Sequence, residues 1–176
     1  MRYMTSSGFH ISSLPSGLKL VLSLYLIANL FGLVVANAKF MQRMEPTPSS
    51  VQEYYQGDAE GADPQVIPGD GEGKSVRYLT DTTHPHLFTV PLVLLVICHL
   101  AHLTQLSQLL LGLLDLGAFL GFFLMFGSPW VLSVQPTTFA LLMIVGGSLL
   151  TVCMGLLCVI PLFAMWSPRS VPDTSG

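Results

Sequence analysis

The chain has 176 residues, of which 51% are hydrophobic and only 10% are charged, and its formal net charge is −3. Soluble domains carry about 25% charged residues, so this composition excludes an ordinary soluble domain and favours an integral membrane protein. The negative charge excludes the basic surface that nucleic-acid binding requires, and the length predicts one compact unit.

The predicted elements begin with a short tail, residues 1–17, and a first apolar segment, residues 18–38. A helix needs roughly 20 apolar residues to cross the hydrocarbon of a bilayer, and this segment is long enough. It ends in Ala36-Asn37-Ala38, the A-x-A pattern of a cleavage site, so a cleaved signal peptide is the alternative to a retained helix. The long tail before the apolar run favours the retained helix.

A long loop, residues 39–86, comes after the first segment. It is rich in glycine, proline and acidic residues and has few large apolar side chains, so we expect a solvated linker without a core of its own. A secretory-like first segment directs the export of the residues on its C-terminal side. We therefore expect the loop in the periplasm and both termini in the cytoplasm, although basic residues, which set orientation, are nearly equal in number on the two sides.

Three further apolar segments are predicted to span the membrane, with a second tail after them: residues 87–103, 109–127, 138–166 and 167–176. The links between the segments are short, which makes consecutive helices antiparallel. Trp130 and Trp166 stand at segment ends, where aromatic residues meet the membrane interface. The sequence therefore predicts an all-α fold, an integral membrane four-helix bundle.

Small residues recur at four-residue spacing in the last two segments. The third segment contains Gly117 and Gly121, and the fourth contains Gly147, Thr151 and Gly155. Such stripes let helix backbones approach closely in lipid, where packing drives association. They predict close contact either between the third and fourth helices or between two copies of the chain.

The string Thr83-His84-Pro85-His86 stands at the predicted start of the second spanning helix. Thr82 or Thr83 can cap a helix and Pro85 suits its first turn, so one interpretation is a structural helix start with two interfacial histidines. The other is a metal or haem ligand pair, because imidazole is the commonest metal ligand. His84 and His86 are therefore the candidate metal ligands.

Two more histidines, His99 and His102, lie three residues apart in the second segment and therefore share a helix face. Asp115, the acidic residue inside an apolar segment, lies at a similar depth across the short link. A His–Asp pair between these helices would satisfy both groups in a low dielectric. We expect a polar membrane cluster of His99, His102 and Asp115, either a structural clamp or a proton or metal site.

A b-type haem needs axial ligands on opposite sides of the porphyrin. The membrane histidines all belong to one segment, and the roughly 13 residues from His86 to His99 turn a helix by about 220°. A haem would therefore need a methionine, such as Met125 or Met143, or a second copy of the chain. The cofactor stays unknown, with a transition metal and haem b as the two open alternatives.

Four stretches of the sequence together resemble a known protein family: Thr83-His84-Pro85-His86-Leu87-Phe88, the hairpin at 100–107, Pro129-Trp130, and the closing segment 160–166. They resemble a largely uncharacterised family of small four-helix bacterial inner-membrane proteins with a Thr-His-x-His helix start, sometimes mislabelled as an elongation factor. The chain departs from the family pattern at Ala164, where an acid is expected. The resemblance implies a multi-pass protein of the bacterial cell inner membrane and a site at His84 and His86.

The residues contain no nucleophile–base pair and no cofactor-binding loop, so we expect an accessory protein rather than an enzyme. The predicted role is in membrane redox or metal handling, through His84 and His86. A haem-binding electron-transfer homodimer and a purely structural or assembly subunit are the alternatives. The expected partners are the lipid bilayer and either a second copy or a larger membrane complex.

Overall fold

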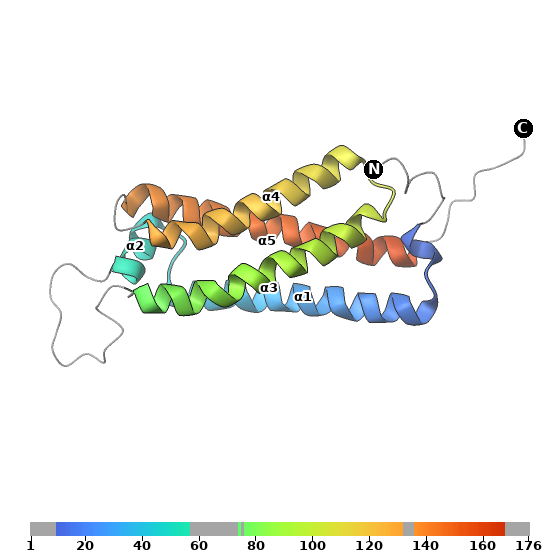
Figure 1. The fold of residues 1–176 in the computed structure, drawn as a ribbon, viewed down its shortest axis with the longest axis horizontal. Helices are drawn as coiled ribbons and strands as arrows, with labels where there is room; N and C mark the ends of the chain where they lie inside the picture. Colours follow the sequence, from blue (N-terminus) through green and yellow to red (C-terminus); the bar gives the residue numbers. More distant parts are fainter. Residues whose placement is uncertain (1–9, 57–73, 75, 132–135, 168–176) are drawn as a thin grey trace, which may run out of the picture.

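The computed structural model describes residues 10–56, 74, 76–131 and 136–167. Within these ranges the chain is helical, and Figure 1 shows four long helices lying side by side. Most of both predicted tails, and residues 57–73 of the predicted loop, lie outside the described residues. The elements are η1 (Ile11–Ser13), α1 (Ser16–Arg43), α2 (Pro48–Gln56), α3 (Val76–His102), α4 (Gln108–Gly127), η2 (Ser128–Trp130) and α5 (Pro136–Trp166).

The four long helices α1, α3, α4 and α5 are each long and apolar enough to cross a membrane. The predicted fold class, an all-α membrane bundle, is thereby confirmed. In Figure 1, α1 begins and α5 ends at the same end of the bundle, which we call the hairpin end because α3 turns into α4 there. We call the opposite end, where α1 ends and α3 begins, the loop end.

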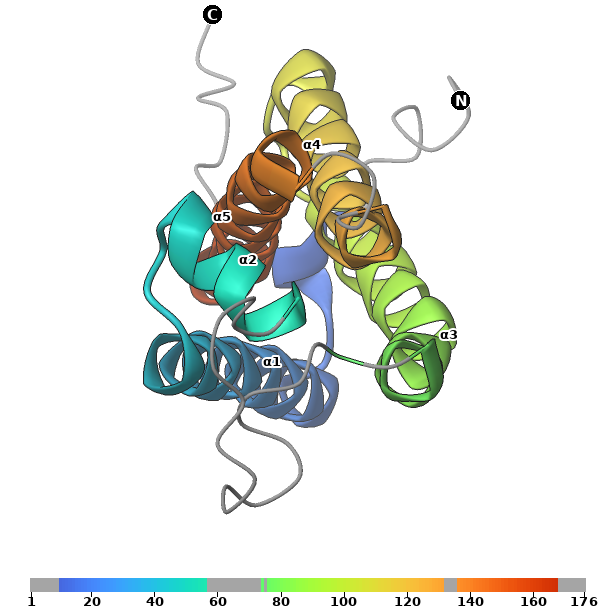
Figure 2. The ribbon, with the colours of Figure 1, turned by 90° about the vertical axis from the view of Figure 1, so that its left-hand side faces the viewer.

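Helix α5 contacts each of the other helices, and its tightest contact is with α4. A Cβ atom added to Gly121 of α4 would lie 2.5 Å from the backbone nitrogen of Leu150 and 2.7 Å from the carbonyl oxygen of Gly146. A Cβ on Gly146 would lie 2.7 Å from the backbone nitrogen of Met125. The two backbones are therefore in direct contact, and only glycine fits at the crossing (Figure 2).

The small residues of α5 serve two neighbours. Gly147 is nearest to the Met125 side chain of α4, but Gly155 faces Leu33 of α1. Thr151 is hydrogen bonded to Asn37 of α1, with 3.2 Å between the Asn37 Nδ2 and the Thr151 Oγ1 atoms. The predicted glycine contact between the third and fourth spanning helices is thus present, whereas the stripe at 151 and 155 is directed to α1.

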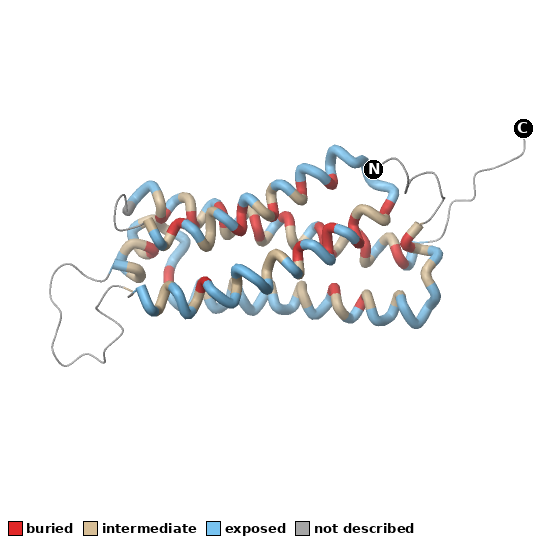
Figure 3. Tube along the Cα trace, in the orientation of Figure 1, coloured by how far each residue is buried: buried red, intermediate tan, exposed pale blue. Residues whose placement is uncertain are grey.

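Helix α1 is the least buried of the four long helices, and Ser23 and Leu26 are its buried residues. At the hairpin end, the Trp166 Nε1 atom donates to the Ser23 hydroxyl at 3.0 Å. In Figure 3 most of α1 is exposed or intermediate, whereas buried positions recur along α3, α4 and α5. Since the exposed side of α1 is apolar, with Phe31 68% exposed, it suits contact with lipid.

The predicted loop contains a helix that we expected to be solvated linker. Thr47 caps α2 by accepting a hydrogen bond from the Ser50 backbone nitrogen at 3.3 Å, and Val51 is fully buried on its inner face. Val51, Tyr54 and Tyr55 form an i, i+3, i+4 stripe that packs on α5 at the loop end. Figure 2 shows α2 lying beside α5 there. The loop cannot build a core, but it docks on the bundle, and burial raises the pKa of Tyr55.

The expected start of the second spanning helix at Thr82 or Thr83 is wrong. Helix α3 begins at Val76 and carries Pro85 in its interior. Its first turns are stabilised by the Thr80 hydroxyl, which donates to the Val76 carbonyl at 2.8 Å. Thr83 is no cap, because its buried hydroxyl accepts a hydrogen bond from the Trp130 Nε1 atom at 3.2 Å. The hydropathy pattern thus located the apolar part of the helix rather than its first residue.

We predict that Gly121→Ala destabilises the bundle by about 1–3 kcal/mol, the usual effect of overpacking. Gly112→Ala in the same helix is the matched control, because a Cβ there meets nothing within 4 Å. That control should be neutral or slightly stabilising, since alanine favours helix over glycine. Thermal unfolding of both variants in detergent, followed by circular dichroism, measures the difference. Equal midpoints would contradict backbone contact at the crossing.

Candidate functional site

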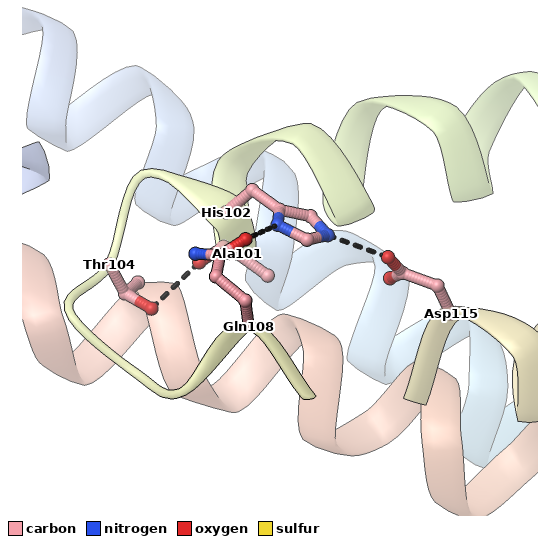
Figure 4. Close-up of polar contacts among 5 residues, drawn as sticks. All are labelled: Ala101, His102, Thr104, Gln108 and Asp115. Carbon is pink, nitrogen blue, oxygen red and sulfur yellow. Dashed lines mark hydrogen bonds and ion pairs between the residues drawn. The ribbon is translucent and has the colours of Figure 1, made fainter. Parts of the chain in front are cut away.

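The turn between α3 and α4 positions the polar cluster at the hairpin end. Thr104, which is buried, donates its hydroxyl to the Ala101 carbonyl at 2.7 Å and closes the last turn of α3. Ser107 then caps α4 by accepting from the Leu110 backbone nitrogen at 3.2 Å. These local bonds fix the reversal of the chain, so that His102 on the end of α3 faces α4 (Figure 4).

His102 lies between two polar side chains of α4, as Figure 4 shows. Its Nε2 atom is 2.7 Å from Oδ2 of Asp115, and its Nδ1 atom is 3.2 Å from Oε1 of Gln108. An imidazolium ring can donate to both oxygen atoms. A neutral ring needs Asp115 to donate its proton, or the Gln108 amide to turn its NH₂ group to the ring. The arrangement can therefore hold a proton between His102 and Asp115.

The second carboxyl oxygen of Asp115 is in a different environment from the first. Oδ1 is buried and has no hydrogen-bond partner among the described residues. The thiol of Cys98 lies beside the same carboxyl group, one helical turn before His102. Cys98 was not among the predicted site residues, although its i, i+4 spacing from His102 places both on one face of α3.

Of the predicted membrane cluster, the structure brings together two members. His102 and Asp115 are in contact, with side chains that are 33% and 22% exposed. His99 is also on α3, but its side chain is exposed and it takes no part in the contact with Asp115. The similar depth of the residues in the membrane and the short link between the helices were sufficient to predict a His–Asp pair. Which of the two histidines contacts Asp115 depends on where the turn after α3 begins.

The predicted pair His84 and His86 is not brought together. Residues two apart in an α-helix are separated by about 200° around its axis, so the two rings point to opposite sides of α3. His84 is exposed, and its ring contacts Phe88 edge-on at 5.4 Å between centroids. His86 is half-buried and stacks on Phe126 of α4, with centroids 4.9 Å apart. The helix therefore prevents one ion from being bound by both side chains.

His86 also makes a hydrogen bond that decides its tautomer. The Nδ1 atom is 2.6 Å from the carbonyl oxygen of Thr82. Because a carbonyl oxygen only accepts hydrogen bonds, Nδ1 must carry the hydrogen, and the neutral ring then has its lone pair on Nε2. His86 thus has one nitrogen in use and one available as an acceptor or ligand.

The described residues include no group of three His, Cys, Asp or Glu side chains placed to hold a metal ion. The side chains of the two methionines considered as haem ligands, Met125 and Met143, are packed against other residues. Met143 is 5% exposed in the cluster beneath α2, and the Met125 side chain lies against Gly147. Within its described part, the chain therefore offers single histidines rather than a complete metal or haem site.

The model of a family described as a transmembrane helical domain matches residues 45–172 of the chain. This range contains α2, α3, α4 and α5, and α1 precedes it. It therefore includes the predicted ligand pair His84 and His86 and the predicted cluster of His99, His102 and Asp115. No curated protein and no solved structure matches the chain.

We predict that His102→Gln and Asp115→Asn are coupled by about 0.5–2 kcal/mol in a double-mutant cycle, because each removes a partner that the other needs. The cycle is measured as unfolding free energy in detergent or bicelles. His99→Gln combined with Asp115→Asn is the control, and its effects should add within about 0.5 kcal/mol. Additive effects for His102 as well would show that the contact has no energetic role.

Proposed function

The chain belongs to the transmembrane helical domain family whose model it matches, and from this premise we propose that it is an accessory protein of membrane redox or metal handling. The proposed location is the bacterial cell inner membrane. The chain acts there as a ligand-bearing subunit and catalyses no reaction itself. The histidine that serves as ligand is His86, and His84 has no part in the site.

One observation carries this proposal, the hydrogen bond from the His86 ring to the Thr82 carbonyl. Histidines that bind metals usually donate their other ring N–H to a carbonyl or carboxylate, which fixes the tautomer and orients the ring. The stacking of His86 on Phe126 also restricts rotation of the ring. Nε2 is therefore already held in the protonation state and orientation that a metal or haem iron would need.

A single ligand does not complete a site, and this favours an accessory role. No three ligand side chains converge in the described part of the chain, and in this proposal the remaining donors come from a second copy or from another membrane protein. Two copies that each supply His86 would give the bis-histidine ligation of a b-type haem. A structural or assembly subunit is the alternative, in which the His86 contacts only join α3 to α4.

We predict that His86→Gln lowers the metal or haem content of the purified protein about tenfold or more, because loss of the ligand removes its main bond. His84→Gln should retain the content of the unchanged protein, since its exposed ring lies on the opposite side of α3. Elemental analysis and the Soret absorption band measure the two alternatives. Retention of the bound group by His86→Gln, or its absence from the unchanged protein, would support the structural alternative instead.

We also propose that the loop end faces the periplasm, with α1 retained as a helix. The support is the secretory-like first segment, together with four spanning helices, which place the start of α1 and the end of α5 on one side of the membrane. An alkaline phosphatase fusion at Gly61 should be active, and a fusion at Gly176 inactive, because the enzyme matures only after export. The reverse pattern would invert the topology, and activity at both positions would contradict an even number of spans.

A further inference from the structure

The loop end contains a cluster of two cations and two tyrosines that joins three helices. The Arg43 Nη1 atom, at the end of α1, donates to the hydroxyls of Tyr54 at 3.3 Å and Tyr78 at 3.5 Å. These two hydroxyls are 2.8 Å apart. The Lys74 ammonium lies over both rings, 4.4 Å from the Tyr54 centroid and 5.6 Å from that of Tyr78. Arg43 is thereby held in place beside α2.

A polar groove of about 480 Å³ opens next to Arg43, between the end of α1 and the start of α2. Charged and hydroxyl-bearing residues are prominent in its lining. They are the cation Arg43, the acids Glu45 and Glu53, and the hydroxyl-bearing Thr47, Ser49 and Ser50. Charges of both signs therefore line the same groove.

These opposite charges do not neutralise one another. The ion pairs found among the described residues, such as Arg77 with Asp81, do not include Arg43. Arg43 therefore forms no ion pair with Glu45 or Glu53, although all three line one groove. Arg43 can therefore bind an anionic group of a ligand while Glu45 and Glu53 bind a cationic group of the same ligand.

The position of the groove indicates where such a ligand comes from. Arg43 is the last residue of a helix long enough to span the membrane, and Met41 in the groove wall is 58% exposed. Tyr54 and Tyr78 stand beside it, as aromatic residues do at a membrane interface. The groove is thus level with lipid headgroups, and acyl chains can continue along the exposed apolar side of α1.

We propose that this groove binds the headgroup of a phospholipid with a primary amine, that is, a phosphoethanolamine headgroup. Its phosphate accepts hydrogen bonds from the Arg43 guanidinium, and its ammonium group donates to the carboxylates of Glu45 and Glu53. A net anionic headgroup meets two carboxylates and is disfavoured. A choline headgroup has no N–H to donate, and the aromatic cage that would bind it is missing because Lys74 covers the rings of Tyr54 and Tyr78.

The test uses the full-length protein in nanodiscs with equal amounts of phosphatidylethanolamine, phosphatidylglycerol and phosphatidylcholine. Lipids that remain bound after transfer to detergent are counted by native mass spectrometry. We expect phosphatidylethanolamine to be enriched about tenfold over phosphatidylcholine, since charge-assisted hydrogen bonds are lost with the latter. Equal retention of the three lipids, or a preference for phosphatidylglycerol, overturns the proposal.

Three variants locate the binding. Arg43→Gln should abolish the enrichment, and the matched control Arg77→Gln should not, because Arg77 is exposed and pairs with Asp81 outside the groove. Since Arg43 also contacts the tyrosines, its replacement can loosen α2. The double variant Glu45→Gln/Glu53→Gln leaves those contacts intact and should shift the preference from phosphatidylethanolamine to phosphatidylglycerol. An unchanged preference in this double variant also overturns the proposal.

Discussion

The contact between the backbones of α4 and α5 at Gly121 and Gly146 fixes α4 on α5 and so determines which α4 side chains meet α3. A membrane gives little hydrophobic drive for helices to associate, so close packing must supply it, and here it does so by bringing main-chain atoms together. With α4 fixed on α5, its side chains meet the histidines of α3 near both ends of the bundle. Asp115 meets His102 near the hairpin end, and Phe126 meets His86 near the loop end.

The two histidines of α3 that contact α4, His86 and His102, have different hydrogen-bond partners. His102 has both ring nitrogens beside oxygen atoms, so its surroundings bind protons and leave no lone pair for a ligand while the contacts last. His86 has one nitrogen on a carbonyl and a flat aromatic neighbour, so its surroundings leave one lone pair. About 16 residues of helix, roughly 24 Å, separate them. The His102–Asp115 contact and the proposed ligand His86 therefore lie toward opposite ends of α3.

Much of this arrangement was predictable because hydropathy identifies the segments that can lie in the hydrocarbon of a membrane. Helices α4 and α5 begin and end within two residues of the predicted bounds, and an acid opposite histidines predicted the Asp115 contact. Helix α3 begins before its predicted start because its first turns are polar and are not part of the apolar run. Helix α2 was missed because the composition of the loop shows only that it cannot form a core of its own. It does not show that part of the loop packs on another helix. The tautomer of His86 depends on one rotamer, which no sequence pattern specifies.

The loop end also connects the lipid interface with the proposed ligand. Arg43, Tyr54 and Tyr78 join the end of α1, the helix α2 and the first turn of α3 through hydroxyl hydrogen bonds. Tyr78 and His86 are on the same helix, about 12 Å apart along its axis. Burial raises the pKa of Tyr54, so its hydroxyl keeps its proton well above neutral pH. A headgroup bound to Arg43 would therefore contact a side chain that is hydrogen bonded to Tyr78 of α3, the helix that also carries His86.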